Sequence, residues 1–325
     1  ALSPTFLTML LQPMSDVPAM ACWVPALLAA VRRRPAAAGL AVALALLIRP
    51  NLAPAAIVPA ALLLAGAQRM RHAVVFACTV APGAAIVAGL NWHYYGSPLQ
   101  TGYGPLAQYY AIDHVMPNAM QYGRWLVTTQ TPFIALWLLM PFVRRSAPDR
   151  GRLLAVTMVF PVVIGAQYLP YLIFHSFEWW YLRFLLPAYP AVFIGLAAVV
   201  VTVAQRMRPR AVAPALPIVI VAVIGWHGWT VAAQAEMLGR KRGDQRYARG
   251  VAFVERLPRD AVIVSLSHSG TISHYTGRDV LRFEALDGLS LDRAVAYLAG
   301  LGKPTYFVGD PFEVEPARRA ERPDM

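Results

Sequence analysis

The sequence predicts a polytopic α-helical membrane protein with a small C-terminal α/β domain outside the cytoplasm. The chain of 325 residues is 58% hydrophobic, with a mean hydropathy of +0.48, which is typical of a membrane protein. Long apolar runs recur up to about residue 231. Residues 1–230 hold 15 Arg and four acidic residues, whereas residues 231–325 hold 14 Lys or Arg and 13 acidic residues. We therefore divide the chain into a membrane region, 1–231, and a small domain, 232–325.

The membrane region contains about eight apolar segments, separated by loops that are alternately rich and poor in arginine. The first three segments are short for a bilayer crossing, which needs about 20 residues. The segments are residues 17–31, 35–48, 52–67, 72–90, 125–143, 153–174, 184–204 and 211–230. Alternatively, the second and third segments form a hairpin whose tip, at Arg49-Pro50-Asn51, lies below the membrane surface.

Arginine counts on the two sides of these segments predict their orientation. The loops on one side hold twelve arginines and the loops on the other side hold three. These three are Arg49, Arg124 and Arg183. Because cytoplasmic loops are enriched in Lys and Arg, the side with twelve arginines is the cytoplasmic one. Asp16, the loops 91–124 and 175–183, and the C-terminal domain then lie outside the cytoplasm.

The C-terminal domain alternates helical and strand patterns, which predicts parallel pairing of its strands. The helices are 244–257 and 291–301, and the strands are 261–266, 280–283 and 305–308. His268-Ser269-Gly270 follows the first strand, but the glycine that a nucleophile elbow places before its serine is missing, and no acid partner is evident. The domain also has no dinucleotide or P-loop motif. We expect an accessory domain without its own catalysis.

Charge and cysteine content exclude several classes of function. The net charge of +12 does not predict a nucleic-acid partner, because the excess lies in the membrane region, where topology explains it. Cys22 and Cys78 both fall in apolar segments, so neither a disulfide nor a cysteine metal site is expected. No cluster with metal-ligand spacing occurs, so no metal site is assigned, although a divalent metal cofactor stays open.

A carboxylate lies at the mouth of the first apolar segment, in the stretch Leu11-Gln12-Pro13-Met14-Ser15-Asp16-Val17-Pro18. One interpretation is a helix cap, since Ser or Asp shortly before Pro is a common helix start. The other is a catalytic carboxylate that orients a sugar, activates a hydroxyl or binds a metal at the membrane surface. The two interpretations are compatible.

Two arginines at the outer face are candidates for binding a lipid phosphate. Arg183 begins an apolar segment, where the alternative is a side chain that extends to the headgroup region. Arg49 lies between two short apolar runs, where an arginine is costly unless it has a partner, and Pro50 breaks the helix beside it. A guanidinium group is planar and permanently charged, so both arginines suit bidentate contact with a phosphate.

Aromatic and polar residues in the two long outer loops are candidates for substrate binding. The loop 91–124 begins with an aromatic, glycine-rich stretch that suits a sugar, although an interfacial aromatic belt explains the same pattern. Asp113-His114, later in this loop, is either a substrate contact or a surface turn. The candidates are His93, Tyr94, Tyr95, Tyr103, Asp113, Glu178 and Tyr181.

Several short motifs come in an order that resembles the GT-C glycosyltransferases. They are Ser15-Asp16-Val17-Pro18, then a basic-ended helix, Leu46-Leu47-Ile48-Arg49-Pro50-Asn51, Tyr95-Gly96-Ser97-Pro98 and Tyr181-Leu182-Arg183-Phe184-Leu185-Leu186-Pro187. The resemblance covers about residues 5–200. Within the GT-C glycosyltransferases, the sequence most resembles the bacterial branch related to dolichyl-phosphate-mannose protein mannosyltransferases and the lipid A aminoarabinose transferase.

The resemblance implies a GT-C-like fold in the bacterial plasma membrane and an inverting transfer of a sugar from a polyprenyl-phosphate donor. The acceptor is then a hydroxyl of a glycan, lipid or protein at the extracytoplasmic face. In this family the leading carboxylate lies in the first outer loop, and Asp16 matches the second outer-loop acid. Since the sequence starts at Ala1 without the charged region of a signal peptide, we expect a fragment that lacks that first loop.

Two other classes of function stay open. A non-enzymatic transporter or polymer-export component should carry polar or broken helices at the midplane and an internal repeat. In this sequence, however, ionisable residues gather at one face and no repeat is visible. A ligase or polymerase acting on lipid-diphosphate glycans is the other class, and the sequence separates it poorly from the glycosyltransferase.

Overall fold

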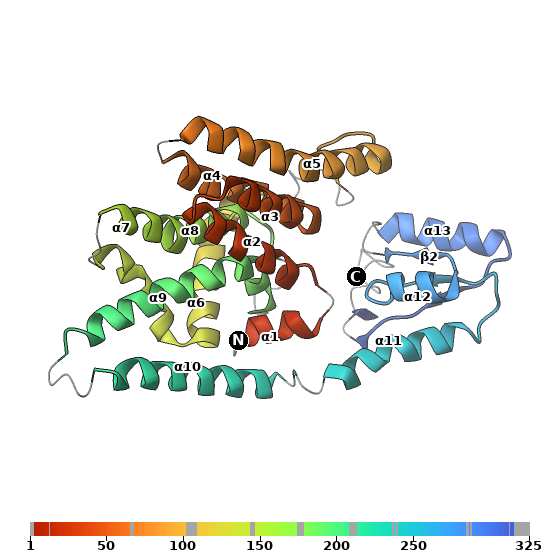
Figure 1. Cartoon of the computed structure of the whole chain (residues 1–325). Helices are drawn as coiled ribbons and strands as arrows, with labels where there is room; N and C mark the ends of the chain where they lie inside the picture. The colour runs from red at the N-terminus through yellow and green to blue at the C-terminus, as the bar shows by residue number, and fades with distance from the viewer. Residues whose placement is uncertain are drawn as a thin grey trace. The chain divides into compact units, whose positions relative to one another are not determined.

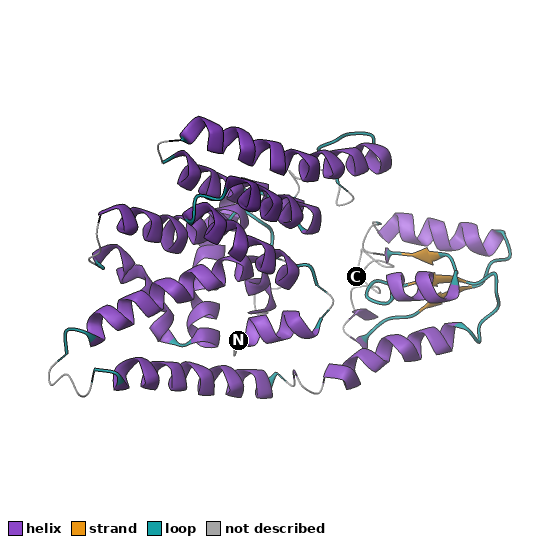
Figure 2. Cartoon of the chain, viewed as in Figure 1, coloured by secondary structure: helices purple, strands orange, loops and turns teal. Residues whose placement is uncertain are grey.

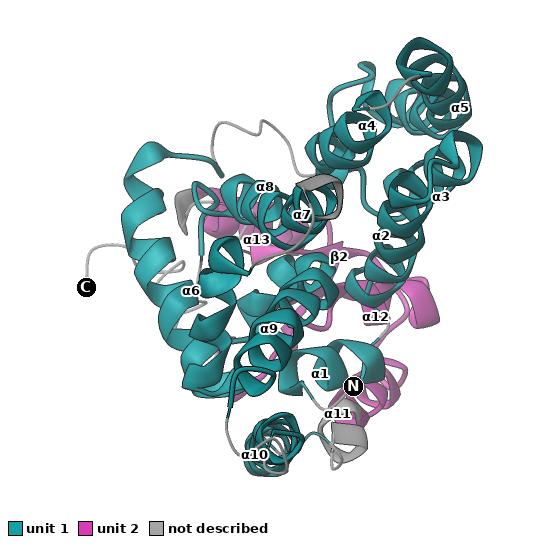
Figure 3. Ribbon diagram, turned by 60° about the vertical axis from the view of Figure 1, so that its left-hand side comes forward, with its two compact units in different colours: residues 1–237 teal, residues 238–325 magenta. Residues whose placement is uncertain are grey.

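The chain divides into two compact units, residues 1–237 and 238–325, which are coloured separately in Figure 3. The computed structural model describes residues 3–12, 14–65, 68–101, 109–143, 147–173, 179–207, 213–235, 237, 240–283, 286, 288–311 and 313–314. Among these residues the first unit is helical, and the strands belong to the second unit (Figures 1 and 2).

The first unit is a series of helices, several of which begin with a proline in the first turn, where no backbone N–H is needed. Its α-helices are α1 (Pro4–Leu11), α2 (Asp16–Val31), α3 (Pro35–Ile48), α4 (Ile57–Leu64), α5 (Arg69–Tyr95), α6 (Val115–Gln130), α7 (Ala147–Leu154), α8 (Phe160–Tyr168), α9 (Tyr189–Ala204) and α10 (Ala215–Gln234). Its tighter or wider helical turns are η1 (Pro50–Ala56), η3 (Ile112–His114), η4 (Pro132–Phe142), η5 (Ala155–Val159) and η6 (Trp179–Ala188).

Several of these helices are apolar and long enough to cross a membrane, as the sequence predicts. Among the described residues, four qualify, and the number rises to six if two bent pairs each count as one span. The four are Arg69–Tyr95, Arg150–Tyr168, Trp179–Ala204 and Ala215–Gln234. The predicted segments 35–48 and 52–67 correspond to shorter apolar helices, Pro35–Ile48 and Pro50–Leu64. These features indicate a multi-pass helical membrane protein.

Small side chains explain why the N-terminal helices pack so closely. α3 lies against both α2 and α5. A Cβ atom added to Gly83 of α5 would lie 2.8 Å from the Ala43 Cβ atom, and one added to Gly39 would lie 2.7 Å from the Phe76 carbonyl oxygen. Small residues allow helix backbones to approach this closely. In lipid, where the hydrophobic effect does not drive helices together, such close packing favours helix association. The alanine-rich sequence therefore serves helix contact.

The loop predicted at 91–124 is shorter in the structure at both ends. α5 continues through Tyr95 and ends where Gly96 adopts a left-handed conformation with φ 75°. α6 begins at Val115, so the predicted span 125–143 starts inside a helix and then bends by 109° at Thr131. The bend has a local cause, because Pro132 disfavours the helical conformation of the residue before it.

The second unit is built on a three-stranded parallel sheet of order β2-β1-β3, which confirms the parallel pairing. Its elements are α11 (Arg240–Val254), β1 (Val262–Val264), α12 (Ser269–Thr276), β2 (Val280–Leu281), α13 (Gly288–Gly300) and β3 (Thr305–Phe307). The central strand β1 is buried along its whole length, as expected for a parallel strand covered on both faces. Ile263 packs in one core cluster and Val264 in another.

Candidate functional site

The Asp16 carboxylate and the Arg49 guanidinium form a buried ion pair in the first unit. Asp16 begins α2, where the helix dipole favours a negative charge. Arg49 follows the last residue of α3, and Pro50 begins η1 immediately after it. The two side chains are 4% and 11% exposed, so both charges are largely removed from solvent. The helix break at Pro50 therefore brings Arg49 to the start of α2.

Aromatic rings surround the Arg49 guanidinium. Its central carbon lies 5.7 Å from the ring centre of Tyr168 and 5.3 Å from that of Phe184. These two rings stack on each other at 4.8 Å with an interplanar angle of 5°. The Tyr168 hydroxyl accepts a hydrogen bond of 2.9 Å from the Asn51 amide, two residues after Arg49. The cation–π contacts stabilise the guanidinium in a place that water scarcely reaches.

Arg183 brings a second guanidinium to the same ring. Its central carbon lies 5.1 Å from the Phe184 ring centre, and its Nη1 atom lies 4.0 Å from the Met14 sulfur. Within the described part of the chain, these contacts of Arg183 include no carboxylate. Two guanidinium groups therefore approach Phe184, while Asp16 supplies one negative charge. Among the described residues, this cluster holds two guanidinium groups and one carboxylate, and a guanidinium group favours an anionic ligand.

Further tyrosines extend the aromatic wall of this site. Tyr181 stacks on Trp125 with ring centres 6.3 Å apart, and it lies 5.8 Å from Phe184. Tyr171 lies 5.3 Å from Phe184 and pairs with Tyr110 through an isolated bridge of antiparallel backbone. Burial raises the pKa of Tyr110, and the nearby Arg49 charge offsets part of that rise. Neutral phenol groups and ring faces thus surround the charged cluster.

The structure brings some of the predicted site residues together and leaves others apart. Asp16, Arg49, Arg183 and Tyr181 share one cluster. His93, Tyr94 and Tyr95 lie at the end of α5 and, among their described ring contacts, meet one another. Asp113 is exposed in η3, as a surface turn would be. Tyr103 and Glu178 lie outside the described residues. Substrate contact by these residues stays a prediction.

Four residues of the cluster were not predicted from the sequence. They are Asn51, Tyr168, Tyr171 and Phe184. Asn51 stands two residues after Arg49, and Phe184 follows Arg183, so closeness in the sequence is a usable signal. Tyr168 and Tyr171 lie at the end of an apolar segment, where tyrosine is typical of any interfacial belt. Their role depends on tertiary packing.

No protein-family model, curated protein or solved structure matches this chain. The site is therefore interpreted from its own geometry. Among the described residues, no group of three or more His, Cys, Asp or Glu side chains is arranged to hold a metal ion. A cavity of about 300 Å³ lies among α6, η4, α8 and α9, with an almost wholly apolar lining that includes Leu126, Ile134 and Val192. Neither Asp16 nor Arg49 nor Arg183 lines it.

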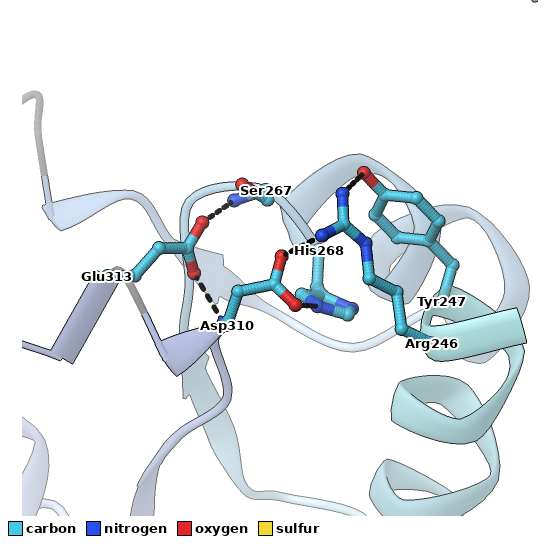
Figure 4. Close-up of polar contacts among 6 residues, drawn as sticks. All are labelled: Arg246, Tyr247, Ser267, His268, Asp310 and Glu313. Carbon is cyan, nitrogen blue, oxygen red and sulfur yellow. Dashed lines mark hydrogen bonds and ion pairs between the residues drawn. The ribbon is translucent and has the colours of Figure 1, made fainter. Parts of the chain in front are cut away.

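A second group of polar side chains lies where β1 and β3 end, in the C-terminal unit (Figure 4). The Asp310 carboxylate is 3.5 Å from His268 Nε2 and 3.0 Å from Arg246 Nη1. The Tyr247 ring centre lies 4.9 Å from that of His268, and a Cβ atom on Gly250 would lie 2.9 Å from His268 Nδ1. His268 is 4% exposed, so α11 covers it and leaves little access for a substrate. This group fastens α11 to the strand ends.

The expectation that His268 has no acid partner is wrong, because Asp310 supplies one from the loop after β3. Ser269 nevertheless does not complete a catalytic triad. Its hydroxyl donates to the Leu266 carbonyl oxygen at 2.6 Å, as a serine in the first turn of a helix often does. Glu313 accepts from the Ser267 backbone N–H at 2.9 Å, which fixes the same loop. Hydrogen bonds within the loops account for the Ser269 hydroxyl and the Glu313 carboxylate.

Replacing Ser269 with Ala should leave the rate of any reaction of the full-length protein unchanged. The hydroxyl bonds to a local carbonyl and points to no described acid or base. The measurement is kcat of the variant beside that of wild type, with melting temperature as a check on folding. A loss of about a hundredfold, the scale of a missing general acid or base, would show that this loop is an active site.

Proposed function

We propose that this chain belongs to a membrane glycosyltransferase that takes a sugar from a polyprenyl-phosphate donor and transfers it to a hydroxyl acceptor. The observation that supports it is the approach of Arg49 and Arg183 to Phe184 beside the Asp16 carboxylate. A lipid phosphate offers the negative charge and the acceptor oxygens that a guanidinium group binds. The rings of Tyr168, Tyr171 and Tyr181 suit the apolar face of a sugar.

The two arginines take different roles in this proposal. Arg183 contacts Met14 and Phe184 and is half-buried, so its guanidinium is placed to bind the phosphate. Arg49 is paired with Asp16, so it holds that carboxylate in position and adds its charge to the site. The sequence suggested that Arg49 binds the phosphate directly. In this proposal Arg49 instead contributes its positive charge without contacting the phosphate. Asp16 positions or activates the acceptor hydroxyl.

The reaction is a single displacement at the anomeric carbon. The acceptor oxygen forms a bond to that carbon, while the bond from the carbon to the phosphate oxygen breaks. Polyprenyl phosphate leaves with the bonding electrons, and the proton of the acceptor hydroxyl passes to a carboxylate. Fixed positive charge at the leaving phosphate stabilises the transition state. The family resemblance places the leading carboxylate in a preceding outer loop and makes Asp16 the second acid.

The arginine asymmetry supports placing this chemistry, and the C-terminal unit, on the extracytoplasmic side of a bacterial plasma membrane. A reporter enzyme that is active only after export, fused after residue 240, should therefore be active. A reporter that works only in the cytoplasm should be inactive at the same position. If only the cytoplasmic reporter were active, the proposed orientation would be wrong. The site would then lie on the cytoplasmic face and not on the face where lipid-linked donors are used.

The direct test of the function is a transfer assay with the full-length protein in lipid vesicles. Radiolabelled sugars linked to polyprenyl phosphate should pass their label to a hydroxyl acceptor in a membrane extract, whereas nucleotide-linked sugars should not. Sugars linked to polyprenyl diphosphate serve as the third donor. If only these diphosphate donors react, the protein is a ligase or polymerase. If none of the donors reacts, a transporter becomes the better account.

A further inference from the structure

Tyr122 of α6 carries a hydroxyl that is buried without a partner. The side chain is 4% exposed, and its oxygen has no hydrogen-bond partner among the described residues. A buried hydroxyl of this kind is unfavourable, and native structures contain few of them. A bound group that accepts a hydrogen bond at this place would remove the penalty.

The surroundings of Tyr122 connect it to the candidate site. A series of ring contacts leads from Tyr122 to Arg183, whose central carbon lies 5.1 Å from the Phe184 ring centre, and Phe184 in turn lies 5.8 Å from Tyr181. The Tyr122 ring meets Trp125 edge-on at 5.8 Å, and Trp125 stacks on Tyr181. The unsatisfied hydroxyl thus belongs to the cluster that contains the phosphate-binding arginine.

Hydrogen bonds hold this part of α6 in place. The Asn118 side-chain amide, one turn before Tyr122, donates to the carbonyl oxygens of Leu169 and Tyr171, both at 2.7 Å. These bonds fix α6 against the segment that follows α8. The backbone of α6 one turn from Tyr122 is therefore held in place, which lowers the entropic cost of a contact made by this side chain.

We infer that the Tyr122 hydroxyl donates a hydrogen bond to the phosphate group bound at Arg183. The Arg183 guanidinium can only donate hydrogen bonds, and the Tyr122 hydroxyl has a proton to donate. A ligand that binds both residues therefore needs several acceptor atoms. A phosphate offers acceptor oxygens and the opposite charge. This inference rests on the proposed function. It adds Tyr122 as a residue that distinguishes a lipid phosphate from an uncharged lipid headgroup.

The experiment compares Tyr122→Phe with Tyr189→Phe in the full-length protein. Tyr189 is the control, since its side chain is also buried at 5% exposure, but its hydroxyl lies beside Thr5. Binding of polyprenyl phosphate, of the uncharged polyprenol and of inorganic phosphate is measured in detergent for wild type and both variants. Inorganic phosphate separates recognition of the headgroup alone from recognition of the lipid.

Tyr122→Phe should weaken binding of polyprenyl phosphate roughly tenfold or more, the scale of a lost hydrogen bond to a charged group. It should not change polyprenol binding, and its ligand-free melting temperature should equal or exceed that of wild type. Tyr189→Phe should bind polyprenyl phosphate as wild type does. Unchanged phosphate binding in Tyr122→Phe, an equal loss for polyprenol, or a lower melting temperature each overturns the inference. Wild type that binds no polyprenyl phosphate overturns the proposed function itself.

Discussion

Replacing Asp16 with Ala should destabilise the helical unit by about 3–5 kcal/mol, the usual cost of removing one partner from a buried ion pair. The Arg49 guanidinium would lose its carboxylate at a position where its side chain is 11% exposed. Its cation–π contacts with Tyr168 and Phe184 are weaker than a buried ion pair. The measurement is thermal unfolding of the full-length protein in detergent.

Two further variants show whether the loss comes from the pair. Replacing Arg49 with Met as well as Asp16 with Ala should recover part of the lost stability, because no charge is then buried without its partner. Asp113→Ala is the matched control, since Asp113 is an exposed acid in η3. If Asp16→Ala melted like Asp113→Ala, the ion pair would contribute nothing to folding, and Asp16 would be only the start of a helix.

Replacing Arg183 with Ala should raise the KM for the polyprenyl-phosphate donor roughly ten- to a hundredfold, as expected when a charge-assisted contact worth about 1.5–3 kcal/mol is removed. Stability should change little, because the arginine contacts only Met14 and Phe184 among its described partners and is half-buried. The measurement is a donor titration in vesicles at saturating acceptor. A pure loss of kcat at unchanged KM would argue against a role in donor binding.

The control for this prediction is Arg124→Ala. Arg124 is an exposed arginine of α6 and also belongs to the side with few arginines. It should lose only the small general attraction for an anionic donor, which salt screens. Arg183→Lys should fall between the two, since lysine keeps the charge but not the planar pair of donors. Equal effects of Arg183→Ala and Arg124→Ala would mean that net charge, rather than a site, attracts the donor.

Asp16, Arg49 and Arg183, which the structure brings into one cluster, were selected from the sequence by the predicted side of the membrane on which their loops lie. Counting arginines places Asp16, Arg49 and Arg183 near one face without any knowledge of packing. It did not show that Arg49 pairs with Asp16, because that contact joins the end of α3 to the start of α2. Pairing across helices depends on tertiary packing, which composition does not specify.

Local backbone chemistry explains other differences between expectation and structure. The span predicted at 125–143 is apolar throughout, yet it bends at Thr131 because a proline follows. In the C-terminal unit, alternation of elements was sufficient to predict parallel strands. The same alternation did not identify Asp310 as the partner of His268, since the two residues follow different strands that pair side by side.

Binding of a donor phosphate by Arg183 can be measured with two lipids that differ only in that group. Polyprenyl phosphate and the corresponding polyprenol are titrated into the full-length protein, its Arg183→Ala variant and its Arg124→Ala variant. We expect tight binding of polyprenyl phosphate to wild type and to Arg124→Ala, loss of that binding in Arg183→Ala, and weak polyprenol binding in all three proteins. Equal binding of the two lipids by wild type would contradict this expectation.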